Sequence, residues 1–148
     1  MNKYLTNTIP TQPSKESKEL VSELMDAVIA GDSGRLKFLV TQGVDINAKD
    51  EYGRTALMWA TTFNEINIVK LLIDFGVDVN VSDKHGYTAL MLAAFYGFTD
   101  IVALLLEHGA DVNKENKYGK TALSLVMDNN VVANLLKAYG GKIWSIIY

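Results

Sequence analysis

Residues 83–115 read DKHGYTALMLAAFYGFTDIVALLLEHGADVNKE, and the chain repeats this stretch on either side. The same pattern, Gly-x-Thr-Ala-Leu, begins at Gly53, Gly86 and Gly119, which lie 33 residues apart. A fixed period of this length is typical of a solenoid, in which each unit buries its apolar face against its neighbours. The sequence therefore predicts stacked repeats.

Each unit divides into a turn and two short helices. Asp83 opens and Gly86 closes a four-residue segment with the residue preferences of a type I turn. Thr88 is placed to cap a first helix, and Gly97 to end it, because glycine accepts the left-handed conformation that closes a helix. A second helix follows and stops at Gly109. In the other units the position that ends the first helix holds Gly31, Asn64 and Asn130.

These units resemble the ankyrin repeat family, whose T-P-L-H-x-A pattern recurs with the same period. The resemblance covers residues 18 to about 141, and residues 109–113 match the family's Gly-Ala-Asp-Val-Asn ending. Alanine replaces the family's proline, and methionine or serine its histidine, which we expect to alter local stability and to leave the fold intact. The resemblance implies an all-α solenoid of four helix-turn-helix units joined by β-hairpin or turn fingers, with atypical capping repeats at both ends.

The period also sets the expected boundaries. Residues 1–13 are polar and aperiodic and contain two prolines, so we expect a disordered tail followed by a single domain over residues 14–148. The first unit has no turn ahead of it, which is typical of an N-terminal cap. The spacing after Asn130 predicts that the second helix of the last unit starts two residues late. The predicted units are 14–49, 50–82, 83–115 and 116–148.

Composition argues against several classes of function. The formal net charge is −3, which gives no general attraction to nucleic acid or to an anionic membrane. There is no cysteine, and the apolar runs are too short to span a bilayer. The first residues show no secretory signal. We therefore expect a cytoplasmic protein with neither a nucleic-acid nor a membrane partner, although delivery into another cell stays open.

No pattern of catalytic or metal-binding residues stands out. His85 and His108 fall on different structural features and lack further ligands nearby in the sequence. Gly119-Lys120-Thr121 lacks the upstream glycine of a phosphate-binding loop. Asp111 and Asn113 have equivalents in the other units, so we interpret them as satisfying backbone groups of the turn. The sequence thus predicts no enzymatic activity, no cofactor and no metal.

The resemblance places binding at the finger tips and at the exposed ends of the first helices, which in the family form a concave strip that grips other proteins. Large aromatic residues occupy many of these positions, and such residues often dominate protein interfaces. The alternative is that the aromatic side chains pack on neighbouring repeats. The predicted partner-binding residues are Glu51, Tyr52, Arg54, Phe63, Lys84, His85, Tyr87, Phe95, Tyr96, Lys117, Tyr118 and Lys120. Thr62, Asp128 and Asn129 complete the strip. Trp59 is expected in the core, because its equivalents are Leu92 and Leu125.

The sequence therefore predicts a monomeric scaffold, of adaptor or inhibitor type, that binds another protein through an aromatic and mildly basic concave groove. One alternative is a self-associating structural protein, a homodimer formed through the apolar C-terminal residues Ile143–Tyr148. The same residues could instead fold back over the last repeat and complete its core. A third alternative is a secreted effector of the ankyrin type.

Overall fold

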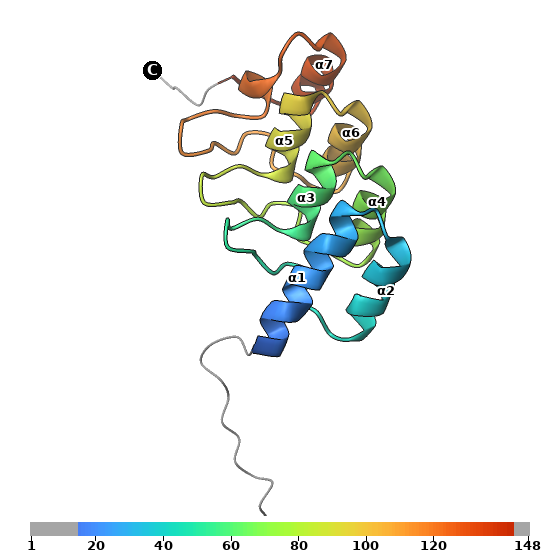
Figure 1. Ribbon diagram of the computed structural model, residues 1–148. Coiled ribbons are helices and arrows are strands. Elements are labelled where there is room, and N and C mark those ends of the chain that lie inside the picture. Colours follow the sequence, from blue (N-terminus) through green and yellow to red (C-terminus); the bar gives the residue numbers. More distant parts are fainter. Residues whose placement is uncertain (1–14, 144–148) are drawn as a thin grey trace, which may run out of the picture.

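The computed structural model describes residues 15–143, which form a stack of helix pairs with loops projecting to one side (Figure 1). The predicted tail, residues 1–13, and the apolar residues Trp144–Tyr148 lie outside the described part. Within it, the helices are α1 (Lys15–Ile29), α2 (Ser33–Thr41), α3 (Ala56–Thr62), α4 (Ile66–Asp74), α5 (Ala89–Tyr96), α6 (Thr99–Glu107), the 3-10 helix η1 (Leu123–Leu125) and α7 (Asn130–Ala138).

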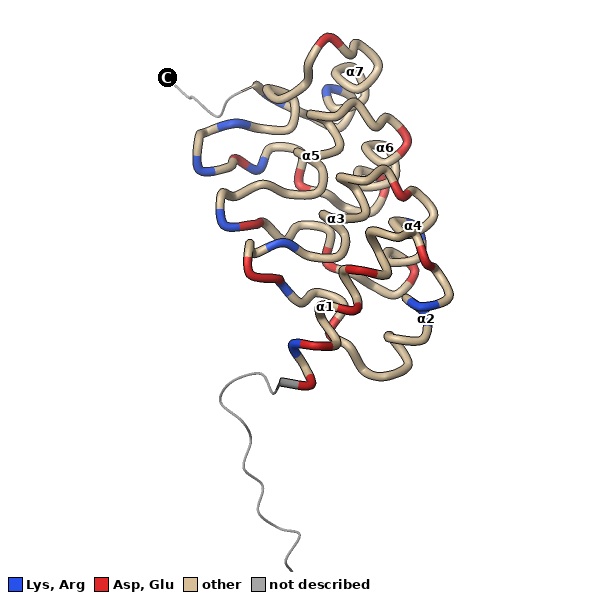
Figure 2. The backbone as a smooth tube through the Cα atoms, in the orientation of Figure 1, with Lys and Arg blue, Asp and Glu red and all other residues tan. Residues whose placement is uncertain are grey.

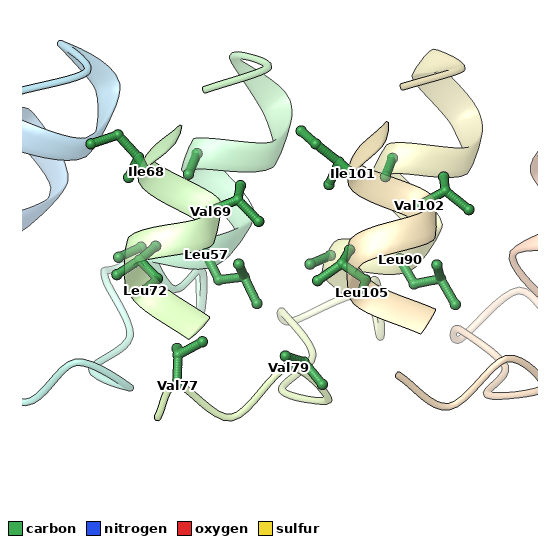
Figure 3. Packing of buried hydrophobic residues seen from close by; sticks show 14 of the residues in the cluster. Leu57, Ile68, Val69, Leu72, Val77, Val79, Leu90, Ile101, Val102 and Leu105 are labelled. Carbon is green, nitrogen blue, oxygen red and sulfur yellow. The ribbon is translucent and has the colours of Figure 1, made fainter. Parts of the chain in front are cut away.

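The helices form two layers. The first helices of the units, α1, α3, α5 and η1, pack side by side in one layer, and the second helices, α2, α4, α6 and α7, form the other. Leu57 and Leu90, one repeat apart, are both 1% exposed. Figure 3 shows that the residues around them also recur, Ile68 with Ile101 and Leu72 with Leu105. The predicted all-α architecture is confirmed.

The predicted helix ends are correct in the first three units. The Oγ1 atom of Thr88 accepts a hydrogen bond from Met91 N at 3.3 Å, and Thr55 caps α3 in the same way. Gly97 has a φ of 73° and Asn64 a φ of 54°, so both adopt the left-handed conformation that closes a first helix. These residues fix where each first helix begins and ends.

The fourth unit differs from the prediction. Asn130 does not close the first helix, because it begins α7, and the left-handed residue is instead Asp128, with a φ of 47°. The prediction of a late start is wrong: α7 begins two residues after its left-handed residue, as α6 does, and has the same nine residues. The fourth unit is two residues shorter than the period, and the shortening falls in its first helix. This helix is reduced to the single turn η1 and is followed by an extended residue, Val126.

The loops between units are fingers closed by turns rather than β-hairpins. Over residues 15–143 no β-strand forms, and the β-type pairing recorded there is an isolated bridge between Ser82 and Thr88. The side chain that opens each turn, Asp50, Asp83 or Asn116, accepts bonds from the loop backbone and holds the loop in place of a strand ladder. We call residues 49–55 finger 1, residues 82–88 finger 2 and residues 115–121 finger 3.

Asparagine side chains join consecutive repeats. Asn80 Oδ1 accepts a bond from Asp111 N at 2.7 Å, and Asn80 Nδ2 donates to Gly109 O at 3.0 Å. Asn113 Oδ1 accepts from Lys142 N at 2.9 Å and thus extends this ladder to the next unit. Asp111 Oδ1 in turn accepts from Asn113 N, at 3.1 Å. The Asp-x-Asn segments therefore satisfy backbone groups, as the sequence indicated.

The chain returns to finger 3 after α7. Thr121 Oγ1 donates to the carbonyl oxygen of Lys142, which brings the start of the C-terminal segment beside the shortened first helix η1. Ile143 is half exposed at this point. Whether Trp144–Tyr148 complete the core stays a prediction.

Candidate partner-binding surface

The tip of each finger is held by the side chain of its second residue, Asp50, Asp83 or Asn116. Asp50 Oδ1 accepts bonds from Tyr52 N and Arg54 N, both at 2.9 Å. Asp83 and Asn116 do the same in fingers 2 and 3. Because the backbone is held by this one side chain, the other side chains at the tip are not needed to close the loop.

Nine of the predicted binding residues fall on three rows that run along the stack, one residue per finger. We call these the charged row, the aromatic row and the inner row after their members and position. The charged row is Glu51, Lys84 and Lys117, the aromatic row is Tyr52, His85 and Tyr118, and the inner row is Arg54, Tyr87 and Lys120.

The aromatic row is the most exposed aromatic feature of the fingers. Tyr52 is 60% and Tyr118 62% exposed. The rings of His85 and Tyr118 stack at 6.2 Å, and Lys117 N donates to His85 O at 3.0 Å. Fingers 2 and 3 are thus joined by ring and backbone contacts, so the part of the row formed by His85 and Tyr118 has a defined shape before any partner arrives.

The inner row is mostly engaged within the protein. Arg54 Nε lies 3.8 Å from Asp83 Oδ2, and the guanidinium carbon lies 4.9 Å from the ring centre of Trp59. Tyr87 is half-buried and packs against the hydrophobic core, which corresponds to the neighbour-packing alternative. Lys120 is exposed.

A fourth row lies at the ends of the first helices. Phe63, Tyr96 and Met127 each precede the left-handed residue of their unit, and they are 50%, 48% and 68% exposed. Phe95 packs edge-on against Tyr96 with ring centres 5.1 Å apart, and Phe98 stacks on Tyr96 with ring centres 5.5 Å apart. We call Phe63, Tyr96 and Met127 the helix-end row.

Sequence reasoning missed Met127 because it carried the period of 33 through the last unit. That choice put Asp128 and Asn129 in the strip, whereas Asn129 caps α7 by accepting a bond from Val132 N at 3.1 Å. Counting back from the helix-closing glycines would have found the shift, since Gly140 follows Gly109 by 31 residues.

A groove of about 1000 Å³ opens between α1 and finger 1. It exists because α1 has 15 residues where α5 has eight, so α1 extends about two turns further and forms a wall opposite the finger. Trp59 packs against the core but is only half-buried and also lines the groove, so the prediction that it is a core residue holds only in part. Its Nε1 atom donates to Asp50 Oδ2 at 2.7 Å, which fixes the indole.

Charge is not uniform along this face. The groove is lined by four carboxylates, Asp26, Asp45, Asp50 and Glu51, against two ammonium groups, Lys18 and Lys49. Finger 3 carries Lys117 and Lys120, and its turn opens with the neutral Asn116. Figure 2 shows mainly acidic segments along α1, segments of both signs at finger 1, and mainly basic segments at finger 3. The concave face, which the sequence predicts to be mildly basic, is thus acidic at the α1 end and basic at the finger 3 end.

The described residues offer little for other kinds of chemistry. Over residues 15–143 no group of three or more His, Cys, Asp or Glu side chains is arranged to hold a metal ion. In the same range no helix has the length and apolarity needed to cross a membrane. His108 Nδ1 lies 2.8 Å from Leu104 O, far along the chain from the His85 contact with Tyr118.

Comparison with known proteins agrees with the repeat period. Residues 24–116 match the family described as "Ankyrin repeats (3 copies)". A stretch of 42 residues is 45% identical to the ankyrin repeat domain-containing protein SAT10 of Stachybotrys chartarum (strain CBS 109288 / IBT 7711). This stretch covers 28% of the chain and 2% of that protein, so the chain corresponds to a very small part of the relative.

Proposed function

Since the chain belongs to the ankyrin repeat family, whose members are generally protein-protein interaction modules, we propose that it is a binding scaffold of adaptor or inhibitor type. Its partner is another protein, held against the finger tips and the ends of the first helices. The family alone does not specify this surface, because function depends on the particular side chains.

One observation carries the proposal: the aromatic and helix-end rows are exposed, and their side chains close neither the turns nor the helix ends. Tyr52, Tyr118 and Tyr96 are all about half or more exposed, while the turn is closed by Asp50 and its equivalents. Exposed tyrosines on a rigid base lose little entropy on binding and often form hot spots. Because the fingers are held in place before binding, we expect little backbone movement on contact.

The test replaces Tyr52 and Tyr96 by alanine together. Each is expected to cost about 2 kcal/mol of binding free energy, so the pair, if the two losses add, should weaken the complex by roughly 1000-fold. The measurement is the dissociation constant for proteins retained from a native lysate and identified by mass spectrometry. Tyr87 is a poor choice for this test, because its half-buried ring also contributes to packing.

Phe38 and Phe75 offer a matched control. They are 56% and 38% exposed but belong to α2 and to the end of α4, in the layer of second helices. Replacing both by alanine removes a similar aromatic area and should leave binding unchanged. Equal binding by all three proteins, with unchanged helicity, would refute the proposed surface.

Self-association is the second candidate, favoured by exposed apolar residues at the C-terminal end of the stack. Met127, Val131 and Ile143 are 68%, 63% and 51% exposed. Under this function, removing Ile143–Tyr148 should convert a dimer into a monomer in static light scattering. A particle whose mass falls only by the deleted residues excludes this candidate.

A further inference from the structure

We infer that the partner presents an extended segment with a basic and apolar end, which lies in the groove beside α1, and an acidic end, which lies against finger 3. This inference rests on the proposed function and adds the chemistry of the bound segment. It follows from the shape of the groove, the charges at the two ends of the face and the distance between them.

The groove favours an apolar side chain accompanied by a positive charge. Val21, Met25 and Ile29 from α1 and Ala48 and Trp59 from the other wall give it apolar sides. The four carboxylates named above outnumber the two lysines at its rim. An inserted apolar side chain gains by leaving water, and a neighbouring Lys or Arg is attracted by the excess negative charge.

Trp59 makes this end different from the later repeats. Leu92 stands at the equivalent position in the third unit and is buried, whereas the indole of Trp59 is held half-open by its bond to Asp50. Arg54 covers one face of the ring, and its charge is offset by Asp83. Glu51 and Asp26 therefore remain to attract a cation from the partner.

Finger 3 favours a carboxylate. Lys117 and Lys120 are exposed there and no ion pair is recorded for either within the described residues. Fingers 1 and 2 open with Asp50 and Asp83, but finger 3 opens with an uncharged amide, so its two lysines outnumber its one carboxylate, Glu115. The charged row changes in the same direction, from Glu51 to Lys84 and Lys117.

The spacing of the two ends sets the length of the segment. Neighbouring packed helices are about 8–10 Å apart, so finger 1 and finger 3, two repeats apart, are separated by roughly 20 Å. An extended chain rises about 3.3 Å per residue. The basic and acidic residues of the partner should therefore be about six residues apart.

The experiment uses a phage-displayed library of random peptides, about 16 residues long so as to span the face with margins, selected on the whole protein. The expected result is enrichment of peptides that carry Lys or Arg next to a large apolar residue and, about six residues away, Asp or Glu. Selected peptides are then synthesised with blocked termini. Binding is followed through the emission of Trp59 in a Trp144→Phe variant, because the chain has two tryptophans.

Charge reversal at each end tests the two contacts separately. Glu51→Lys and Lys117→Glu should each lower the affinity for these peptides about 5- to 10-fold, and the effect should shrink as the salt concentration is raised. Glu107→Lys and Lys70→Glu make the same charge changes on exposed positions of α6 and α4, in the other layer, and should have little effect. Equal losses from these controls would overturn the inference.

Two further outcomes separate the inference from the proposed function. The inference would be overturned, and the scaffold function supported, by peptides that lack the charge order and whose affinity is unchanged by both charge reversals but still depends on Tyr52 or Tyr96. Absence of any enriched peptide that depends on the aromatic or helix-end rows would overturn the proposed binding surface, and the inference with it.

Discussion

The two ends of the stack finish the same repeat in different ways. At the N-terminal end the first helix is lengthened to the 15 residues of α1, which cover the side of the second unit and leave a groove beside finger 1. At the C-terminal end the first helix is shortened to the single turn η1, and the returning chain is held there by Thr121. One end gains helix surface, whereas the other replaces it with hydrogen bonds.

This difference shows that the N-terminal cap has enough helix surface both to stabilise the stack and to line a groove. Packing of α1 against α2 and α3 is extensive, so the N-terminal cap stays packed on the stack although the groove beside it is open. The C-terminal cap has less apolar surface to bury and depends more on individual polar contacts. Four tests address this contrast, in order of decreasing expected effect.

The largest effect is expected from Leu24→Ala in α1. Leu24 is 0% exposed, as is Leu136 in α7, and truncation leaves a cavity in either case. We expect Leu24→Ala to lower the free energy of unfolding by about 3 kcal/mol and Leu136→Ala by about 2 kcal/mol, because the surroundings of Leu136 relax more easily. Urea unfolding followed by circular dichroism gives both values. A larger loss at Leu136 would contradict the contrast.

Gly86→Ala and Gly119→Ala compare an inner finger with the last one. Gly86 has a φ of 81°, and an added Cβ would lie 2.9 Å from Asn116 Cα. Gly119 has a φ of 71° with nothing within 4 Å. We expect a loss of about 3 kcal/mol at Gly86 but only about 1 kcal/mol at Gly119, where backbone strain acts alone. Equal losses in thermal or urea unfolding would mean that the fingers do not stack closely.

Thr121→Val removes both the bond that the Thr121 hydroxyl accepts from Ser124 N and the bond that it donates to Lys142 O. Its expected cost is about 2 kcal/mol, against about 1 kcal/mol for Thr88→Val, which loses a helix cap alone. Hydrogen exchange at the Lys142 amide, which is bonded to Asn113, should speed up only in the Thr121 variant. Thr121→Ser keeps the hydroxyl and should restore slow exchange; failure to do so would assign the effect to packing.

The smallest effect is expected from Trp59→Leu, which installs the residue of the next repeat. Because the indole is half-buried, the loss of stability should stay within about 1 kcal/mol, mainly from the lost bond to Asp50. The binding free energy of the selected peptides should fall far more than the free energy of unfolding. A loss of several kcal/mol in urea unfolding would restore the interpretation of Trp59 as a core residue.

The repeat register predicted most of the fold, since Thr88, Gly97 and their equivalents determine the helix ends by local chemistry. It failed in the fourth unit because Leu123, Ser124 and Leu125 still fit a helical pattern, while the early turn at Val126 and Asp128 reflects a deletion that the pattern does not locate. Trp59 was assigned to the core by equivalence with Leu92. Periodicity ignores that an indole needs an acceptor for its N–H and that no finger precedes this unit to cover it.

The hydrogen bonds that Asn80 and Asn113 make to the following unit have a consequence for how repeats can be added to such a protein. Asn80 and Asn113 make the same pair of bonds to the unit that follows, although one is followed by a full repeat and the other by the end of the stack. A duplicate of residues 83–115 inserted after Glu115 would meet the same donor and acceptor on both sides. Tandem duplication could thus add a finger and widen the reach of the molecule without redesigning a single junction.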